Sequence, residues 1–132
     1  MSTSIFMALA LATQAFSLPP GLLGSICFTE SRHNPRAFHK DDGIENSVGL
    51  CQLHVSTAKM MGFKGKETGL YDPKVNAHYA GKYLAHQLKR YGGDTRKAVA
   101  AYNSGTYRTN PKGEIMNRKY VSKVFAQWAA TN

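Results

Sequence analysis

The clearest structural signal in this chain is the segment between Asp72-Pro73 and Gly92-Gly93. An aspartate followed by a proline is a common start of a helix, and a pair of glycines is a common end. Between them, apolar side chains recur at the spacing of one helix face, from Val75 through Leu84 to Tyr91. The segment therefore predicts a long helix with one buried face.

The rest of the chain also has helical spacing, interrupted by short breaks. We expect helices near residues 3–15, 17–31, 56–61 and 94–104, and a last one carrying Tyr120 and Trp128. Ser17 and Ser56 are the expected N-caps of the second and third, and Pro19-Pro20 would lie in the first turn of the second. The composition between residues 36 and 51 predicts a loop or a small β-hairpin. The sequence thus predicts a mainly α fold of about six helices.

The length bounds the number of domains. A chain of 132 residues with 42% hydrophobic content can bury one core, so we expect one domain over residues 1–132. The apolar run from Ile5 to Leu11 has no preceding Lys or Arg and no cleavage site after it, so it is predicted to be a helix of the domain and not a secretory signal. It is too short to span a membrane. Export would then use another route or an upstream segment.

The charge balance restricts the class of partner. Seventeen Lys and Arg residues against eight Asp and Glu residues give a net charge of +9, which favours nucleic acid, an anionic membrane or an anionic cell-wall polymer. Basic residues occur in short pairs such as Lys89-Arg90 and Arg118-Lys119, without the aromatic-interleaved stripe of a nucleic-acid-binding helix. No specific nucleic-acid site and no membrane insertion are therefore expected.

Glu30 is the candidate functional residue of the second helix. It follows Ile26 by four positions and Cys27 by three, so its carboxyl group lies on the apolar face of the helix. Apolar surroundings raise the pKa of a carboxyl group, and an acid still protonated near neutral pH can donate its proton to a glycosidic oxygen. The alternative is a glutamate that turns to water or pairs with Arg32 or Arg36. Asn34-Pro35 is expected to end this helix.

Three blocks carry a family resemblance: TESRHNP at residues 29–35, SVGLCQL at 47–53 and AAYNSG at 100–105. In this order and spacing they resemble the lytic transglycosylase catalytic domain, a single-glutamate relative of goose-type lysozyme, from about residue 9 to 124. The resemblance implies a lysozyme-like fold with any β-hairpin near the active site. It also implies cleavage of the MurNAc-GlcNAc β-1,4 bond of peptidoglycan without water, leaving 1,6-anhydromuramic ends. Glu30 matches the residue that acts as general acid and then as base.

The resemblance also assigns substrate-binding roles. Gln52 would meet a sugar acetamido group, His54 would line the groove, the hydroxyl of Tyr102 would reach the catalytic carboxyl, and Asn103 would meet the sugar. Tyr120 is a candidate for the groove wall. His39 stands where many members have a serine that contacts the glutamate, and it either tunes the pKa of Glu30 or is an exposed loop histidine. Trp128, beyond the matched region, is assigned to the core.

Several alternatives remain at this point. Goose-type lysozymes carry loop aspartates that hold a water, so Asp42, Asp41 or Glu45 would serve a hydrolytic muramidase; the turn sequence Asp41-Asp42-Gly43 explains these acids without catalysis. A lysozyme-like module that binds glycan or nucleic acid without cutting is another alternative, but binding alone needs no acid. The resemblance brings Cys27 and Cys51 together, and we expect two buried thiols there, with a disulfide as the alternative in an oxidising compartment.

The expected setting follows from the same resemblance. No cofactor is implied, and no metal is assigned because His33, His78 and His86 lack cysteine or carboxylate partners at ligand spacing. The expected partner is the peptidoglycan glycan strand, met by a monomer in the periplasm or on the cell wall. Small domains of this kind resemble those tied to phage particles or to secretion machines that cross the wall.

Overall fold

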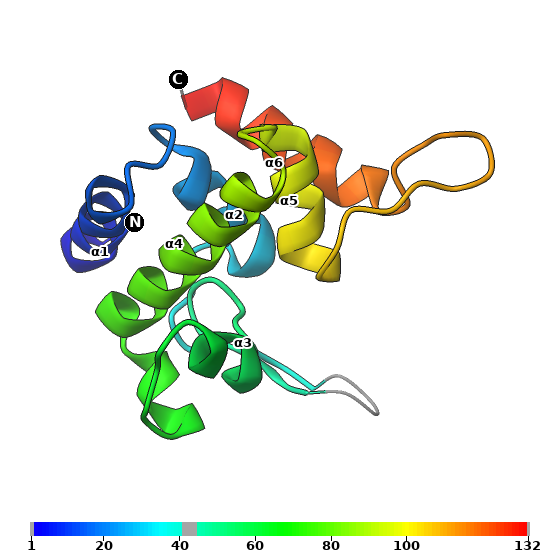
Figure 1. Cartoon of the computed structure of the whole chain (residues 1–132). Helices are drawn as coiled ribbons and strands as arrows, with labels where there is room; N and C mark the ends of the chain where they lie inside the picture. The colour runs from blue at the N-terminus through cyan, green and yellow to red at the C-terminus, as the bar shows by residue number, and fades with distance from the viewer. Residues whose placement is uncertain (1, 41–44, 132) are drawn as a thin grey trace.

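The fold is mainly helical, as the sequence predicts. A computed structural model describes residues 2–40 and 45–131. This part of the chain contains six α-helices, one short 3-10 helix and one two-stranded antiparallel sheet (Figure 1). In chain order the elements are α1 (Thr3–Ala15), α2 (Leu22–Ser31), β1 (Phe38–His39), β2 (Ser47–Val48), α3 (Val55–Met60), η1 (Glu67–Tyr71), α4 (Pro73–Arg90), α5 (Thr95–Ser104) and α6 (Arg118–Thr131).

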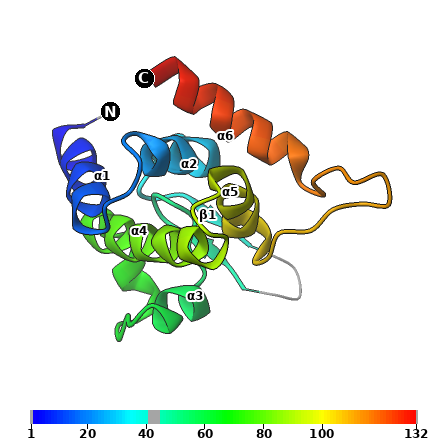
Figure 2. The same ribbon diagram turned by 45° about the horizontal axis from the view of Figure 1, so that its top comes forward.

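Helix α4 runs through the middle of the molecule. Figures 1 and 2 show α1 on one side of it and α5 on the other, and both helices pack against it. Helix α2 packs against α6, which closes the structure from the C-terminal end. Trp128 of α6 donates its indole N–H to the carbonyl of Pro20 across 2.7 Å. Its side chain is partly buried and packs against the core, as expected from the sequence.

The boundaries of α4 and α5 are set by local chemistry. The carboxylate of Asp72 accepts the N–H of Lys74 at 2.9 Å, and that of Asp94 accepts the N–H of Lys97 at 3.0 Å. Both are N-caps that satisfy backbone donors left free at the start of a helix. Gly92-Gly93, both with positive φ, end α4 as predicted. These signals act over a few residues, which is why they could be recognised in the sequence.

The predicted cap of the second helix is wrong. Ser17 has a φ of 52° and lies just past α1, where the N–H of Leu18 bonds back to the carbonyl of Thr13 at 2.9 Å. This is the left-handed ending that commonly closes a helix. The two prolines precede α2, which begins at Leu22 after Gly21. Ser17 therefore ends one helix instead of starting the next.

Two other local expectations need correction. Ser56 lies inside the first turn of α3 and does not cap it; the residue before the helix is His54. Helix α2 does end at Ser31, as expected, but the chain turns there because Arg32 and His33 adopt left-handed φ values of 55° and 62°. Asn34-Pro35 follows this turn and does not cause it.

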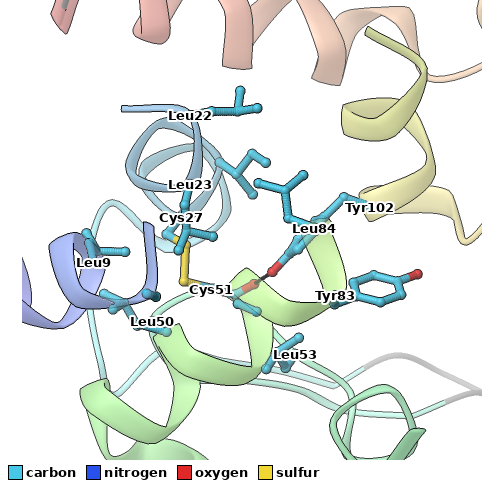
Figure 3. Packing of buried hydrophobic residues seen from close by; sticks show 14 of the residues in the cluster. Leu9, Leu22, Leu23, Cys27, Leu50, Cys51, Leu53, Tyr83, Leu84 and Tyr102 are labelled. Carbon is cyan, nitrogen blue, oxygen red and sulfur yellow. Dashed lines mark hydrogen bonds between the residues drawn. A yellow bond between two sulfur atoms is a disulfide. The ribbon is translucent and has the colours of Figure 1, made fainter. Parts of the chain in front are cut away.

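The expectation of two free thiols is also wrong. Cys27 of α2 and Cys51 form a disulfide, and both residues are fully buried. Figure 3 shows the bridge surrounded by Leu9, Leu23 and Leu50, within the one hydrophobic cluster to which these elements contribute. In the part of the chain that the structure describes, no helix is both long enough and apolar enough to cross a membrane.

Candidate active site

Glu30 lies in the last turn of α2, with its carboxyl group largely removed from water. The hydroxyl of Tyr120, in α6, donates a hydrogen bond to Oε2 of Glu30 across 2.8 Å. Burial raises the pKa of Glu30 from 4.5 to about 7, against the opposing effects of the Tyr120 hydrogen bond and of nearby His39. About half of the Glu30 side chains are therefore protonated at neutral pH.

The end of α2 is fastened to the segment that follows β2. The disulfide joins Cys27, one turn before Glu30, to Cys51. The hydroxyl of Ser31 donates to the carbonyl of Leu50 across 2.5 Å. A covalent bond and a hydrogen bond on either side of Glu30 thus hold this carboxyl group against the turn at residues 49–52.

The turn at residues 49–52 depends on a close backbone approach at Gly49. Gly49 has a φ of 79°, and a Cβ atom there would lie 2.4 Å from the carbonyl oxygen of Leu70 and 2.5 Å from Nδ2 of Asn76. Only glycine satisfies both conditions. Glycine is therefore required at position 49 both by the backbone conformation and by the space available.

Asn76 of α4 supplies the polar contacts beneath this turn. Its Nδ2 donates to the carbonyls of Val48 and Leu70, each at 2.8 Å, and its Oδ1 accepts the N–H of Cys51 at 2.9 Å. The side chain is fully buried, so these bonds satisfy backbone groups that water does not reach. Sequence reasoning missed Asn76, although an amide four residues before Ala80 on the buried stripe of a helix indicates such a partner.

The side-chain amide of Gln52 bonds to other residues of the protein. Its Nε2 donates to the carbonyls of Ala37 and Gly49, at 3.2 and 3.0 Å, and its Oε1 lies 2.5 Å from Nδ1 of His39. The expected contact with a sugar acetamido group would have to share these partners. Gln52 has a φ of 54°, a left-handed value that is unfavourable for a residue other than glycine and that these contacts maintain.

The hydrogen bonds of Tyr102 and Tyr120 differ from those expected, because Tyr102 was expected to reach the carboxyl group of Glu30. The hydroxyl of Tyr102, in α5, donates to the carbonyl of Cys51 across 2.9 Å (Figure 3), whereas the hydroxyl of Tyr120 reaches the carboxyl group. Burial raises the pKa of both phenols well above 10, so both stay protonated. Tyr102 therefore braces the disulfide segment, and Tyr120, expected only as part of the groove wall, is the hydrogen-bond donor to Glu30.

Glu30 opens into a cleft of about 420 Å³ between α2, α5 and the segment from β2 to α3. Asn103, which is exposed and accepts a hydrogen bond from Nδ2 of Asn117 at 2.9 Å, lines this cleft together with His54 and Tyr102. His39, on β1, is not among the residues that line the cleft, but it contacts Gln52, which does line it. Sequence reasoning did not identify the remaining lining residues as site residues: Ser47, Leu53, Thr57, Tyr83, Ser104 and Gly105.

The three loop acids of the hydrolytic alternative have different outcomes. Asp41 and Asp42 lie outside the described residues. The carboxylate of Glu45 accepts both the N–H and the hydroxyl of Ser56, at 3.2 and 2.7 Å, which gives it a structural role at the start of α3. Among the described residues that line the cleft, Glu30 is the only carboxylate. The described ranges also contain no group of three His, Cys, Asp or Glu residues arranged to hold a metal ion.

Comparison with known proteins gives the family. Residues 7–125 match the family described as the transglycosylase SLT domain. A transglycosylase of Enterobacteria phage PRD1 is 36% identical over 99 residues, which are 75% of this chain and 34% of that protein. The peptidoglycan transglycosylase gp16 of Escherichia phage T7 is 32% identical over 111 residues, which are 81% of this chain and 8% of that protein. The chain thus spans about a third or less of these two relatives.

A solved structure has the same fold. The X-ray structure of an inactive mutant of the lytic transglycosylase Slt from Pseudomonas aeruginosa matches 94% of this chain and 23% of its own, with a TM-score of 0.77 and 20% identity. At this identity the match concerns the fold, and it confirms the expected lysozyme-like architecture. The family match covers nearly the whole chain and includes the helix of Glu30, the Gly49 turn and α5. This chain belongs to the transglycosylase SLT domain family.

Proposed function

We propose that this chain is a peptidoglycan lytic transglycosylase that cleaves the β-1,4 bond between N-acetylmuramic acid and N-acetylglucosamine, with Glu30 as the catalytic acid and then the base. The observation that carries the proposal is the state of Glu30: a carboxyl group with a pKa of about 7, hydrogen-bonded to Tyr120 and lining a cleft. A general acid is most effective when its pKa lies near the working pH. Membership of the transglycosylase SLT domain family indicates the kind of reaction in which this acid takes part.

The reaction needs two proton transfers through one carboxyl group. Protonated Glu30 gives its proton to the glycosidic oxygen as the bond to C1 of the muramic residue breaks. The resulting carboxylate takes the proton of the C6 hydroxyl of that sugar, and O6 bonds to C1 to close a 1,6-anhydro ring. No water is consumed. The hydrogen bond from Tyr120 stabilises the carboxylate between the two transfers.

A single carboxylate in the described cleft supports this route over hydrolysis, which normally uses a second acid to activate water. Asn103 and His54 line the cleft, and we propose that they contact the sugars. Gln52 and Tyr102 are proposed to support the substrate site by holding its backbone, because their polar atoms already have protein partners.

The test is the mass of the new glycan ends. Purified chain incubated with peptidoglycan sacculi is expected to release fragments with 1,6-anhydromuramic ends, which are lighter by one water than hydrolytic ends. Glu30→Gln is expected to lower the rate by roughly two to four powers of ten, since the amide keeps the shape but donates no comparable proton. Glu114→Gln is the matched control, because Glu114 is exposed and lies 3.7 Å from Arg118 in a surface ion pair. Reducing muramic ends would identify a lysozyme instead, and Asp42→Asn, Asp41→Asn or Glu45→Gln would then cripple the enzyme.

The setting is proposed on the same basis. We propose that residues 1–132 act as one monomeric domain on the glycan strands of the periplasm or cell wall, carried by a virion or an envelope-spanning complex. Two phage proteins among its relatives support the virion route. The net charge of +9 suits the anionic wall. Recovery of the chain from purified particles, or from an envelope complex, is the corresponding measurement.

A further inference from the structure

The contacts of Gln52 determine where His39 carries its proton. The two N–H donors of the Gln52 amide point to the carbonyls of Ala37 and Gly49, so the amide oxygen must be the atom that faces His39. An amide oxygen only accepts hydrogen bonds. At 2.5 Å from this oxygen, Nδ1 of His39 must therefore be the donor, in the neutral as well as the charged ring. In the neutral ring, Nε2 is then the nitrogen without a proton.

The strand pairing turns His39 toward the cleft. In the antiparallel sheet, His39 of β1 pairs with Ser47 of β2. Residues directly opposite each other in such a pair project on the same face of the sheet. Ser47 lines the same cleft as Glu30, and so does Gln52, which holds the imidazole ring. The ring is thus placed beside the residues that line the cleft and is exposed to solvent, and the electrostatic effect of His39 lowers the pKa of Glu30.

We propose that His39 is a positioning residue for the reaction of Glu30: Gln52 keeps one proton on Nδ1, and the positive charge of the ring that also carries a proton on Nε2 makes it easier for Glu30 to release its own. This inference rests on the proposed function, in which Glu30 is the acid. When Nε2 is protonated, the imidazolium stabilises the Glu30 carboxylate formed after proton donation. When it is neutral, Nε2 is a free hydrogen-bond acceptor at the edge of the glycan site.

Among the described residues, His39 is the group whose charge affects the pKa of Glu30. Tyr120 from α6 and Tyr102 from α5 face the carboxyl group as neutral phenols, because burial raises the pKa of each well above 10. Ser47 and Gln52, which contact or flank His39, carry no charge. Lys40 follows His39 in the chain and is exposed. Asp41 and Asp42 lie outside the described residues, so the test below also includes Asp41→Asn and Asp42→Asn.

His39→Asn provides a matched variant. The side-chain N–H of asparagine occupies a place close to that of Nδ1 in histidine, so the variant keeps a donor to Gln52 while it removes Nε2 and its charge. If His39 were only structural, His39→Asn would behave as the wild type. The proposal predicts that the pKa of Glu30 in this variant is higher by roughly half a unit to one unit, the loss of a nearby, partly screened positive charge.

Two measurements test this. The first follows the Glu30 carboxyl carbon by NMR through a pH titration of the wild type, His39→Asn and the control His86→Asn, an exposed histidine of α4. The proposal is supported if the pKa of Glu30 is higher in His39→Asn but not in His86→Asn, and if the same increase occurs when His39→Asn is combined with Asp41→Asn or Asp42→Asn. An unchanged pKa of Glu30 in His39→Asn overturns it. The second reads the ring tautomer from the imidazole ¹⁵N shifts: a neutral ring protonated at Nδ1 is expected, and one protonated at Nε2 overturns the proposal.

Both NMR readouts are independent of cleavage. If the wild type releases no fragments from sacculi, the proposed function fails while the coupling of His39 to Glu30 can still be measured. If the wild type cleaves, the alkaline limb of its pH profile is expected to move to higher pH in His39→Asn with an unchanged melting temperature. A cleavage profile that coincides with that of the wild type would show that His39 does not act through Glu30.

Discussion

Tyr120 donates its hydroxyl proton to Oε2 of Glu30 across 2.8 Å, although 90 residues separate the two in the chain. The contact joins the last turn of α2 to the first turn of α6, and α2 and α6 also pack against each other along their length. The proposed acid is therefore completed by a side chain from the opposite end of the chain. This contact lowers the pKa of Glu30, which burial raises.

Removal of the Tyr120 hydroxyl is expected to raise the pKa of Glu30 above about 7, because the carboxylate loses a hydrogen bond that stabilises it. Tyr120→Phe should shift the alkaline limb of the cleavage profile upward by about one pH unit, the equivalent of one hydrogen bond to a charged group. Tyr102→Phe is the matched control: its hydroxyl bonds to the Cys51 carbonyl, so we expect a loss of about 1 kcal/mol in stability and an unmoved limb. Equal shifts in both variants would contradict this assignment.

The raised pKa of Glu30 also predicts how stability depends on pH. The folded protein keeps the Glu30 proton up to about pH 7, whereas the unfolded chain releases it near 4.5. The contribution of Glu30 is therefore fully present below pH 4.5 and is lost as the pH rises through 7. Relative to Glu30→Gln, the wild type should lose about 3 kcal/mol between these limits. Urea unfolding of both proteins at pH 4 and pH 8 measures this, and a constant difference would mean that folding does not raise the pKa of Glu30.

The disulfide is expected to stabilise the fold by about 3 kcal/mol, since it closes a loop between residues separated by 24 positions. Reductant should lower the melting temperature of the wild type. The double variant Cys27→Ala/Cys51→Ala, in which nothing can be reduced, should melt at the same temperature with and without reductant. In denaturant, no thiol should react before reduction; two reactive thiols would exclude the bridge.

Gly49→Ala is expected to destabilise the protein by about 3 kcal/mol or more, because the methyl group combines a positive φ with collisions at the Leu70 carbonyl and Asn76. Gly92→Ala separates the two effects. Gly92 has a φ of 63° and nothing within 4 Å of an added Cβ, so only the backbone cost of about 1–2 kcal/mol applies. Denaturant unfolding of the two variants should differ accordingly, and equal losses would mean that the turn relaxes around the methyl group.

The features recognised from the sequence are those that local chemistry determines. The caps at Asp72 and Asp94, the glycines after α4 and the apolar face that carries Glu30 all depend on neighbours within about four residues. Ser17 shows the limit of this approach, because a serine near two prolines fits the start of a helix as well as the end of the one before. Only the packing of α1 and α2 decides between them.

The features missed depend on contacts between distant segments. Nothing near Tyr102 or Tyr120 in the sequence indicates which hydroxyl reaches Glu30; the docking of α6 on α2 decides it. The pairing of Cys27 with Cys51 likewise depends on the turn at Gly49 lying against α2. The family resemblance brought these segments together but carried no information on the choice between thiols and a bridge.

The mutual dependence of Gly49 and Asn76 has an evolutionary consequence. Asn76 occupies the space beside Gly49 and bonds three backbone groups of the segments around it, so a change at either position alone produces a collision or leaves buried groups without partners. Neutral drift by single substitutions is thereby blocked at this pair. Asn103 and Ser104 are exposed residues that line the cleft, so substitutions there can change the cleft surface while the frame that holds Glu30 stays in place.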